Sequence, residues 1–246
     1  KHPVIDVMNF MKYDAMTLGN HEFNFGLDLV DKIDEEAEFP ILAANATYKE
    51  DGSFLTEAYV IKEVAGIKVG ILGITNPNIA RWDGTKVASL NFASPLATAE
   101  KYIPEMKEKG ADIIFLSTHM GYESEYGGDG ADEVIAAFPE VAGVLTGHAH
   151  VTEQQKVGNT LVGAAKNAGA QVVRFDFELA KAEGKWTIVN SEVKAIDVKE
   201  YAASEELKEY AKESHEKTLE FLVEVIGTVT ENFSPESEIP GIPEAQ

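Results

Sequence analysis

The chain has 246 residues, no cysteine and a formal net charge of −21, from 21 Lys and Arg against 42 Asp and Glu. The absence of thiols excludes disulfides, zinc–thiolate sites, iron–sulfur clusters and cysteine nucleophiles. So acidic a surface disfavours a protein that coats nucleic acid or anionic membranes. An anionic substrate would have to be attracted by a local positive charge, such as a bound metal ion.

Apolar β-rich runs alternate with helical stretches over most of the chain, a pattern typical of an α/β fold. Ala65-Gly66 is expected to turn a hairpin between two of the strands. From residue 204 the chain becomes a strongly charged helix, which ends before a Pro-rich tail. The expected helices are 4–11, 28–38, 97–109, 132–137 and 204–226, and the expected strands are 14–18, 41–44, 59–64, 67–74, 113–116, 141–145, 160–163, 171–179 and 186–196.

Side chains that can bind metal follow three of the expected strands. In α/β sheets ligands gather beyond the carboxyl ends of the strands, so we expect these side chains to share one rim. Imidazole nitrogens and amide oxygens suit borderline divalent ions such as Zn, Mn, Fe or Co. The candidate residues, in chain order, are Asn20, His21, His119, His148 and His150.

Each of these motifs taken alone has a simpler explanation. A single strand-end histidine such as His119 is more often a hydrogen-bonded structural residue, and Asn20-His21 can be an ordinary turn. In Gly147-His148-Ala149-His150 the two imidazoles lie on one side if the backbone is extended, and can serve different metals if it bends. The occurrence of all three clusters in order favours a metal site.

In this order the clusters resemble the signature of the calcineurin-like metallophosphoesterases, and most closely the bacterial nucleotidases that act on 5′-nucleotides and on 2′,3′-cyclic nucleotides. The resemblance implies an α/β fold with a two-sheet sandwich flanked by helices. It also implies an exported protein, secreted, at the cell surface or in the periplasm. The matching blocks are Gly19-Asn20-His21-Glu22, Thr118-His119-Met120-Gly121 and Gly147-His148-Ala149-His150.

The resemblance further implies a site with two divalent metal ions and a nucleotide substrate. Asn20, His119 and His148 are expected to bind one ion and His150 the other. His21 is expected to be the catalytic residue that stabilises the transition state or protonates the leaving oxygen. Asn20 is also expected to contribute to substrate binding.

Two blocks of the family signature, Asp-x-His and Gly-Asp, are absent. We therefore expect the chain to be truncated at its N-terminus and to lack the family's first strands, which leaves a sheet edge exposed or filled by a partner chain. Such a chain would hold one metal weakly and be inactive alone. Residues 1–200 are expected to form this incomplete catalytic domain, and 201–246 a linking helix and the start of a nucleotide-binding domain.

A second departure from the family lies at Asn24, where many 5′-nucleotidases have Asp. The Asn form is similar to the branch that opens 2′,3′-cyclic nucleotides and removes 3′-phosphates, and so is Ile226-Gly227-Thr228 after the long helix. The expected function is metal-dependent hydrolysis of these nucleotides. The alternatives are a 5′-nucleotidase or UDP-sugar hydrolase on the same scaffold, and a folded but inert fragment or binding module.

Overall fold

The computed structural model describes residues 1–228. The chain divides into two compact units, the first spanning Lys1–Ala203 and the second beginning at Ser204. This division lies close to the expected boundary after residue 200, while the role of the second segment as the start of a further domain stays a prediction. Among the described residues no helix combines the length and hydrophobicity that crossing a membrane requires.

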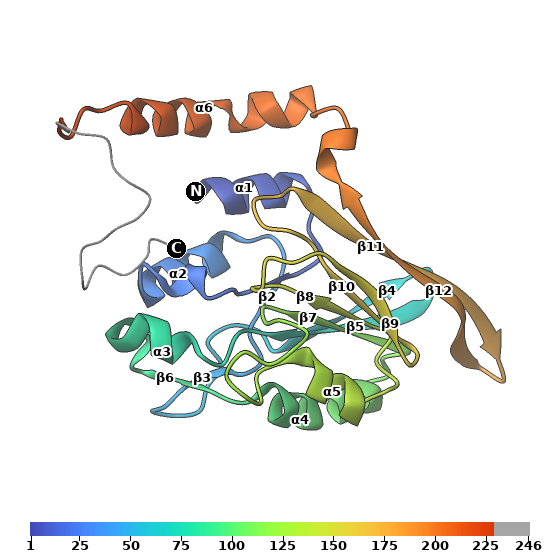
Figure 1. The fold of residues 1–246 in the computed structure, drawn as a ribbon. Helices are drawn as coiled ribbons and strands as arrows, with labels where there is room; N and C mark the ends of the chain where they lie inside the picture. The colour runs from blue at the N-terminus through green and yellow to red at the C-terminus, as the bar shows by residue number, and fades with distance from the viewer. Residues whose placement is uncertain (229–246) are drawn as a thin grey trace, which may run out of the picture. The chain divides into compact units, whose positions relative to one another are not determined.

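The first unit is built from short helices and twelve strands, and the described part of the second, up to residue 228, contains one long helix (Figure 1). The helices are α1 (Pro3–Phe10), α2 (Leu27–Glu36), α3 (Ile79–Asp83), α4 (Pro95–Glu108), α5 (Ala131–Ala137) and α6 (Glu205–Leu222), with 3₁₀ turns η1 (His21–Phe23), η2 (Gly84–Val87) and η3 (Val198–Glu200). The strands are β1 (Met16–Thr17), β2 (Ile41–Leu42), β3 (Ala46–Tyr48), β4 (Tyr59–Val64), β5 (Ile67–Ile74), β6 (Leu90–Phe92), β7 (Ile113–Thr118), β8 (Gly143–Thr146), β9 (Glu153–Val157), β10 (Thr160–Ala164), β11 (Gln171–Ala182) and β12 (Lys185–Asp197).

The central sheet has six strands in the order β4-β5-β7-β8-β10-β9. Its four inner strands run parallel, and the antiparallel strands β4 and β9 form its two edges. The predicted hairpin is confirmed, since β4 and β5 pair across Ala65 and Gly66, whose φ angles are 52° and 80°. Two adjacent residues with positive φ form the tight turn that suits the twist of a hairpin. The α/β expectation is therefore confirmed.

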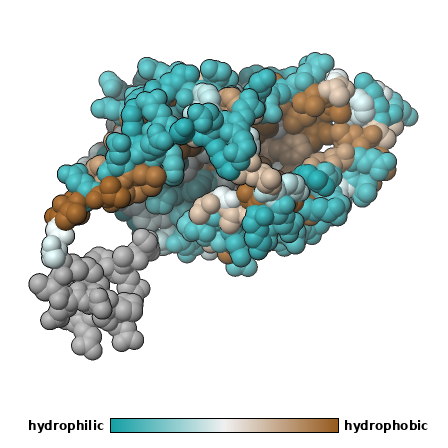
Figure 2. Space-filling model, turned by 90° about the horizontal axis from the view of Figure 1, so that it is seen from above, coloured by the Kyte–Doolittle hydropathy of each residue, from teal (hydrophilic) through white to brown (hydrophobic). Residues whose placement is uncertain are grey.

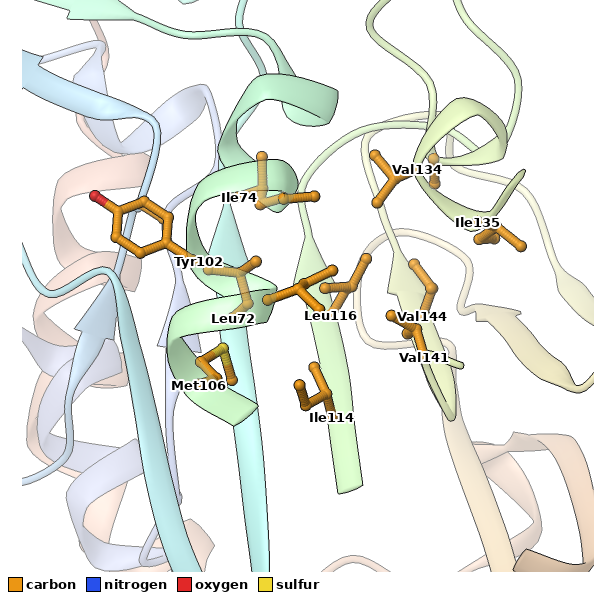
Figure 3. Packing of buried hydrophobic residues seen from close by; sticks show 14 of the residues in the cluster. Leu72, Ile74, Tyr102, Met106, Ile114, Leu116, Val134, Ile135, Val141 and Val144 are labelled. Atoms are coloured by element: carbon orange, nitrogen blue, oxygen red, sulfur yellow. The ribbon is translucent and has the colours of Figure 1, made fainter. Parts of the chain in front are cut away.

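One face of this sheet packs against α4 and α5 (Figure 3). Alternate residues of the parallel strands point to this face, as the twofold period of a strand requires. Leu72, Leu116 and Val144 lie there with no exposed surface. Tyr102 and Met106 from α4, and Val134 and Ile135 from α5, complete the cluster. The helices cover the apolar strands and leave the strand ends free for polar residues.

The other face is covered by two smaller pairs of strands, β1-β2 and β11-β12, which gives two strand layers flanked by helices. A Cβ atom built on Gly73 of β5 would lie 2.1 Å from Cβ of Leu42 in β2. A Cβ built on Gly163 of β10 would lie 2.5 Å from Val173 in β11. Glycines at these positions let the second layer approach the sheet closely.

Gly73→Ala is expected to destabilise the fold by about 1–3 kcal/mol, because the added methyl group overpacks the contact with Leu42. Urea unfolding followed by circular dichroism measures this difference. The matched control is Gly227→Ala, since no atom of residues 1–228 lies within 4 Å of a Cβ at that position, apart from its chain neighbours. Equal stability of the two variants would contradict the close approach of the two layers.

The hairpin β11-β12 exposes several apolar side chains. Val172, Ile188 and Val189 are exposed by 56%, 38% and 61%. Figure 2 shows apolar surface around a hollow over this part of the molecule, at the right of the view. An apolar surface of this kind is suited to packing against another chain segment.

A second buried cluster supports the segment that follows β1. Leu18 and Phe23 have no exposed surface and pack with Ile5 and Val30 from α1 and α2. Leu18 and Phe23 flank Asn20 and His21 in sequence, so the polar pair lies between two buried side chains. The expected strand 14–18 is shorter than predicted, since only Met16 and Thr17 pair with β2.

Several short elements were not predicted from the sequence, namely α3, β3, β6 and β9. They are three to five residues long, so hydrophobic periodicity has too few repeats to indicate them. Helix α3 matters most for the site, because it carries Trp82 and Asp83.

Candidate metal centre

The carboxyl ends of β1, β7 and β8 meet at one rim, as the sequence predicts. The hydroxyl of Thr17 at the end of β1 donates to the carbonyl oxygen of Ser117 in β7 at 3.1 Å. The backbone N–H of Gly147, just after β8, donates to the carbonyl oxygen of Met120 at 3.1 Å. The first contact joins residues 100 positions apart in the chain, and the second joins the ends of two neighbouring strands of the sheet.

Two glycines make room for the ring of His119. A Cβ on Gly19 would lie 2.9 Å from Cε1 of His119, and a Cβ on Gly147 would lie 3.3 Å from its Nδ1. The imidazole therefore lies between two backbone segments that carry no side chain on that side. The close approach explains why Gly precedes both Asn20 and His148 in the sequence.

A nitrogen of this ring meets two other atoms that can bind a metal. Oδ1 of Asn20 lies 2.9 Å from Nε2 of His119 and 3.3 Å from Nδ1 of His148. Ligand atoms on metal bonds of about 2.0–2.2 Å are separated by about 3.0–3.5 Å in octahedral or tetrahedral coordination. The two distances from Oδ1 of Asn20 and the chemistry of the three atoms thus fit a single borderline divalent ion.

His119 has the protonation state that a ligand needs. Burial is the largest cause, and together with the neighbouring His148, His21 and His150 it lowers the pKa of His119 to about 4. The ring is then neutral near pH 7, with a nitrogen lone pair available. The other three predicted histidines therefore lie close enough to His119 to act on it electrostatically.

His150 stands apart from the convergent group. It is exposed and has a left-handed backbone with φ of 55°, and His148 has φ of 63°. The backbone of the loop is therefore not extended at either histidine. Of the two conformations left open by the sequence, the structure adopts the bent one. In residues 1–228 no cluster of three or more His, Cys, Asp or Glu side chains is arranged to hold a metal, and the convergent group comprises two histidines and an amide.

The far side of His148 is held by residues that the sequence did not reveal. Its Nε2 lies 3.1 Å from Oε2 of Glu125, and Trp82 stacks on its ring at 5.1 Å between centroids. A carboxylate behind an imidazole fixes the tautomer and leaves the other nitrogen for a metal. Glu125 therefore leaves Nδ1 of His148 facing Asn20.

The loop that carries Glu125 is organised by the buried carboxylate of Asp129. This carboxylate accepts hydrogen bonds from the Ser124 hydroxyl, from the backbone N–H groups of Glu125 and Tyr126, and from the amide of Asn78. Burial alone would raise the pKa of Asp129, but these hydrogen bonds outweigh it and lower the pKa. The loop is tied to the segment that leads into α3, and both carry residues that contact His148.

His21 lies next to this group on the turn η1 and is exposed. Its Nδ1 lies 2.8 Å from Oδ1 of Asn24, one turn further along the chain. The amide nitrogen of Asn24 in turn donates to Oδ1 of Asp83 at 3.1 Å and to Oδ2 at 3.4 Å. The opposite ring nitrogen, Nε2, remains for another partner.

The site residues that were not predicted from the sequence share one property, since each acts through contacts between segments that are distant in the chain. Glu125 and Asp129 lie in a loop rich in Gly and Ser, whose composition indicates a turn but no partner. Trp82 and Asp83 lie at the end of the five-residue helix α3. No spacing rule connects these positions to His21 or His148.

Comparisons with known proteins identify the family of the chain. The family model described as calcineurin-like phosphoesterase matches residues 4–152, more than half of the chain. The chain is 29% identical to the trifunctional nucleotide phosphoesterase protein YfkN of Bacillus subtilis, over 92% of the chain and 17% of that protein. It is 30% identical to a 2′,3′-cyclic-nucleotide 2′-phosphodiesterase/3′-nucleotidase of Salmonella typhimurium, over 94% of the chain and 41% of that protein.

The fold is similar to that of a solved relative. The crystal structure of calcineurin-like phosphoesterase YfkN from Bacillus subtilis superposes with a TM-score of 0.84 at 29% identity, over 91% of this chain and 76% of that one. The chain spans less than half the length of the two curated relatives named above. From its matched motifs, its fold and the family model, the chain belongs to the calcineurin-like phosphoesterase family.

Proposed function

We propose that this chain forms the catalytic part of a metal-dependent enzyme that hydrolyses nucleotide phosphoesters, foremost 2′,3′-cyclic nucleotides and 3′-nucleotides. The observation that carries the proposal is the convergence of Asn20, His119 and His148 at the strand rim, with His21 beside them. The relatives named as acting on 2′,3′-cyclic nucleotides match nearly the whole chain and support this substrate class.

In the proposal Asn20, His119 and His148 hold one divalent ion, and His150 contributes to a second. Divalent ions in such sites lower the pKa of a bound water and neutralise charge on the phosphoryl oxygens. This local positive charge would also admit a phosphate into a protein whose formal net charge is −21. Asn20 supplies a neutral oxygen, so its ion would remain a stronger Lewis acid than with a carboxylate at that position.

His21 is the proposed acid for the leaving oxygen. Its Nδ1 is occupied by Asn24, which leaves Nε2 to face a substrate. A protonated imidazole there would donate its hydrogen to the ester oxygen as the bond to phosphorus breaks. The 5′-nucleotidase and UDP-sugar hydrolase alternatives share this chemistry and differ in the nucleotide that is positioned. The proposed setting is outside the cytoplasm, as the family resemblance implies.

Two assays test the function. Hydrolysis of bis-p-nitrophenyl phosphate with added Mn distinguishes an enzyme from an inert module. Rates on 2′,3′-cyclic AMP, 3′-AMP and 5′-AMP then separate the substrate classes, and we expect the first two to be hydrolysed fastest. No hydrolysis by the metal-loaded, full-length protein would contradict the enzyme, and a preference for 5′-AMP would contradict the substrate class.

Glu125→Ala is expected to weaken divalent metal binding by about 10–100-fold, since His148 loses the carboxylate that fixes its tautomer. Calorimetric titration with Mn measures this effect. Glu123→Ala is the matched control, because it removes a nearby exposed carboxylate of the same loop. Equal affinities of the two variants would show that Glu125 has no part in metal binding.

A further inference from the structure

We propose that Asp83 is a positioning residue for His21, which acts through the side-chain amide of Asn24 to select the ring nitrogen that carries the hydrogen. The proposal rests on the proposed function only for the role given to His21. Its structural content, the orientation of one amide and one imidazole, can be tested without any substrate.

Whether each group can donate or accept determines the direction of the two hydrogen bonds that link Asp83, Asn24 and His21. A carboxylate only accepts, so the group of Asn24 that faces Asp83 must be its NH₂, at 3.1 Å from Oδ1. The carbonyl end of the same amide then faces His21, at 2.8 Å from Nδ1. Because that oxygen also only accepts, Nδ1 of His21 must carry a hydrogen. Nε2 is left as the atom that meets the leaving group.

An asparagine alone cannot make this selection. Its amide has a donating end and an accepting end of nearly the same shape, and an imidazole can satisfy either by changing its tautomer. With the amide reversed, Nδ1 would accept and Nε2 would hold the hydrogen of the neutral ring. The carboxylate of Asp83 removes this ambiguity. In the reversed orientation the amide oxygen of Asn24 would face the carboxylate oxygens of Asp83, and two acceptors cannot form a hydrogen bond.

The surroundings of Asp83 suit a fixed orienting group. Its side chain is 4% exposed and lies at the end of α3, whose first residue Ile79 has no exposed surface. Lys86 lies 3.4 Å from Oδ1 and balances the charge. Asp83 also precedes the turn η2, yet its side chain makes no capping hydrogen bond there. The carboxylate is thus directed to Asn24 and Lys86 rather than to its own backbone.

The tautomer of His21 is the direct test. In protein labelled with ¹⁵N-histidine and loaded with diamagnetic Zn, we expect nitrogen chemical shifts of a protonated Nδ1 and an unprotonated Nε2 for the neutral ring. The His21→Ala variant assigns these signals by their loss. In Asp83→Asn the population with hydrogen on Nε2 should rise several-fold. An unchanged tautomer in a folded Asp83→Asn protein would overturn the proposal.

A double-variant cycle separates positioning from a general structural role. Asp83→Asn alone is expected to lower kcat roughly 10- to 100-fold with little change in KM, a fraction of the full contribution of a general acid. In Asn24→Asp the new carboxylate accepts from His21 directly, so orientation no longer depends on residue 83. Adding Asp83→Asn to the Asn24→Asp variant should not lower kcat further. It also removes the repulsion between the carboxylates at positions 24 and 83.

The outcomes distinguish this proposal from the proposed function. Equal losses from Asp83→Asn in both backgrounds would identify a structural role and overturn the positioning. If Asp83→Asn does not fold, the Asn24→Asp variant and the double variant still test the proposal. A double variant that folds but lacks the tautomer with hydrogen on Nδ1 of His21 would contradict it. A selected tautomer in a protein without phosphoesterase activity would uphold the positioning and refute the function. Asp176→Asn, an exposed carboxylate on β11, controls for the loss of charge.

Discussion

His21→Ala is expected to lower turnover of the full-length enzyme by about 10²–10⁴-fold while its metal content stays close to that of the native protein. The reason is that His21 lies beside the convergent group without belonging to it: its Nδ1 binds Asn24, and none of its contacts is with Asn20 Oδ1. Removal of the ring takes away the proposed acid and leaves the metal-binding atoms in position. Steady-state kinetics and elemental analysis on the same sample measure the two quantities.

His215→Ala is the matched control for this experiment. His215 is an exposed residue of α6, in the second unit of the chain. We expect it to leave turnover unchanged. Native turnover in His21→Ala would remove His21 from the mechanism, and a parallel loss of metal would instead make it a ligand.

Asn20→Ala and His148→Ala are expected to give the opposite result, with metal stoichiometry reduced and turnover lost together. Each substitution removes an atom of the group in which Nε2 of His119 and Nδ1 of His148 both lie within 3.3 Å of Oδ1 of Asn20. Since loss of an outer partner alone costs about 10–100-fold in affinity, loss of a direct ligand should cost more. Elemental analysis after dialysis measures the stoichiometry.

Thermal unfolding provides a second measure of the same effect. A metal that binds only the folded state stabilises it, by about 2.7 kcal/mol at a free concentration one hundred times its Kd. Added Mn should therefore raise the unfolding temperature of the native protein and of Asn91→Ala, an exposed asparagine on β6. It should not raise that of Asn20→Ala or His148→Ala. Unaltered stoichiometry and an undiminished shift in these two variants would refute the ligand assignment.

Local patterns were sufficient to predict most of the long elements. The apolar run 67–74 next to Ala65-Gly66 indicates a buried strand in a hairpin, and β4 and β5 have the predicted bounds. The amphipathic run 97–109 corresponds to α4, which begins at Pro95 because Ser94 caps it. These elements could be predicted because periodicity and turn chemistry are properties of neighbouring residues.

The rim of candidate ligands was also accessible from the sequence, since residues after parallel strands meet at one end of a sheet whatever else the chain does. This rule predicts that Asn20, His119 and His148 lie at the rim. The structure brings the side chain of Asn20 into contact with those of both histidines. The bent backbone at His148 and His150 is one of two conformations that the sequence leaves open. Their left-handed backbones select it.

The sequence by itself determined the class of fold, the strand-end position of the histidines and the chemistry of the atoms that could meet there. Only the tertiary structure decided how those atoms are held: Glu125 behind His148, and Asp83 behind Asn24 and His21. These contacts join residues 23 and 59 positions apart in the chain. No local periodicity extends over such distances, because the contacts depend on how the loops and α3 pack over the sheet rather than on the residues beside them.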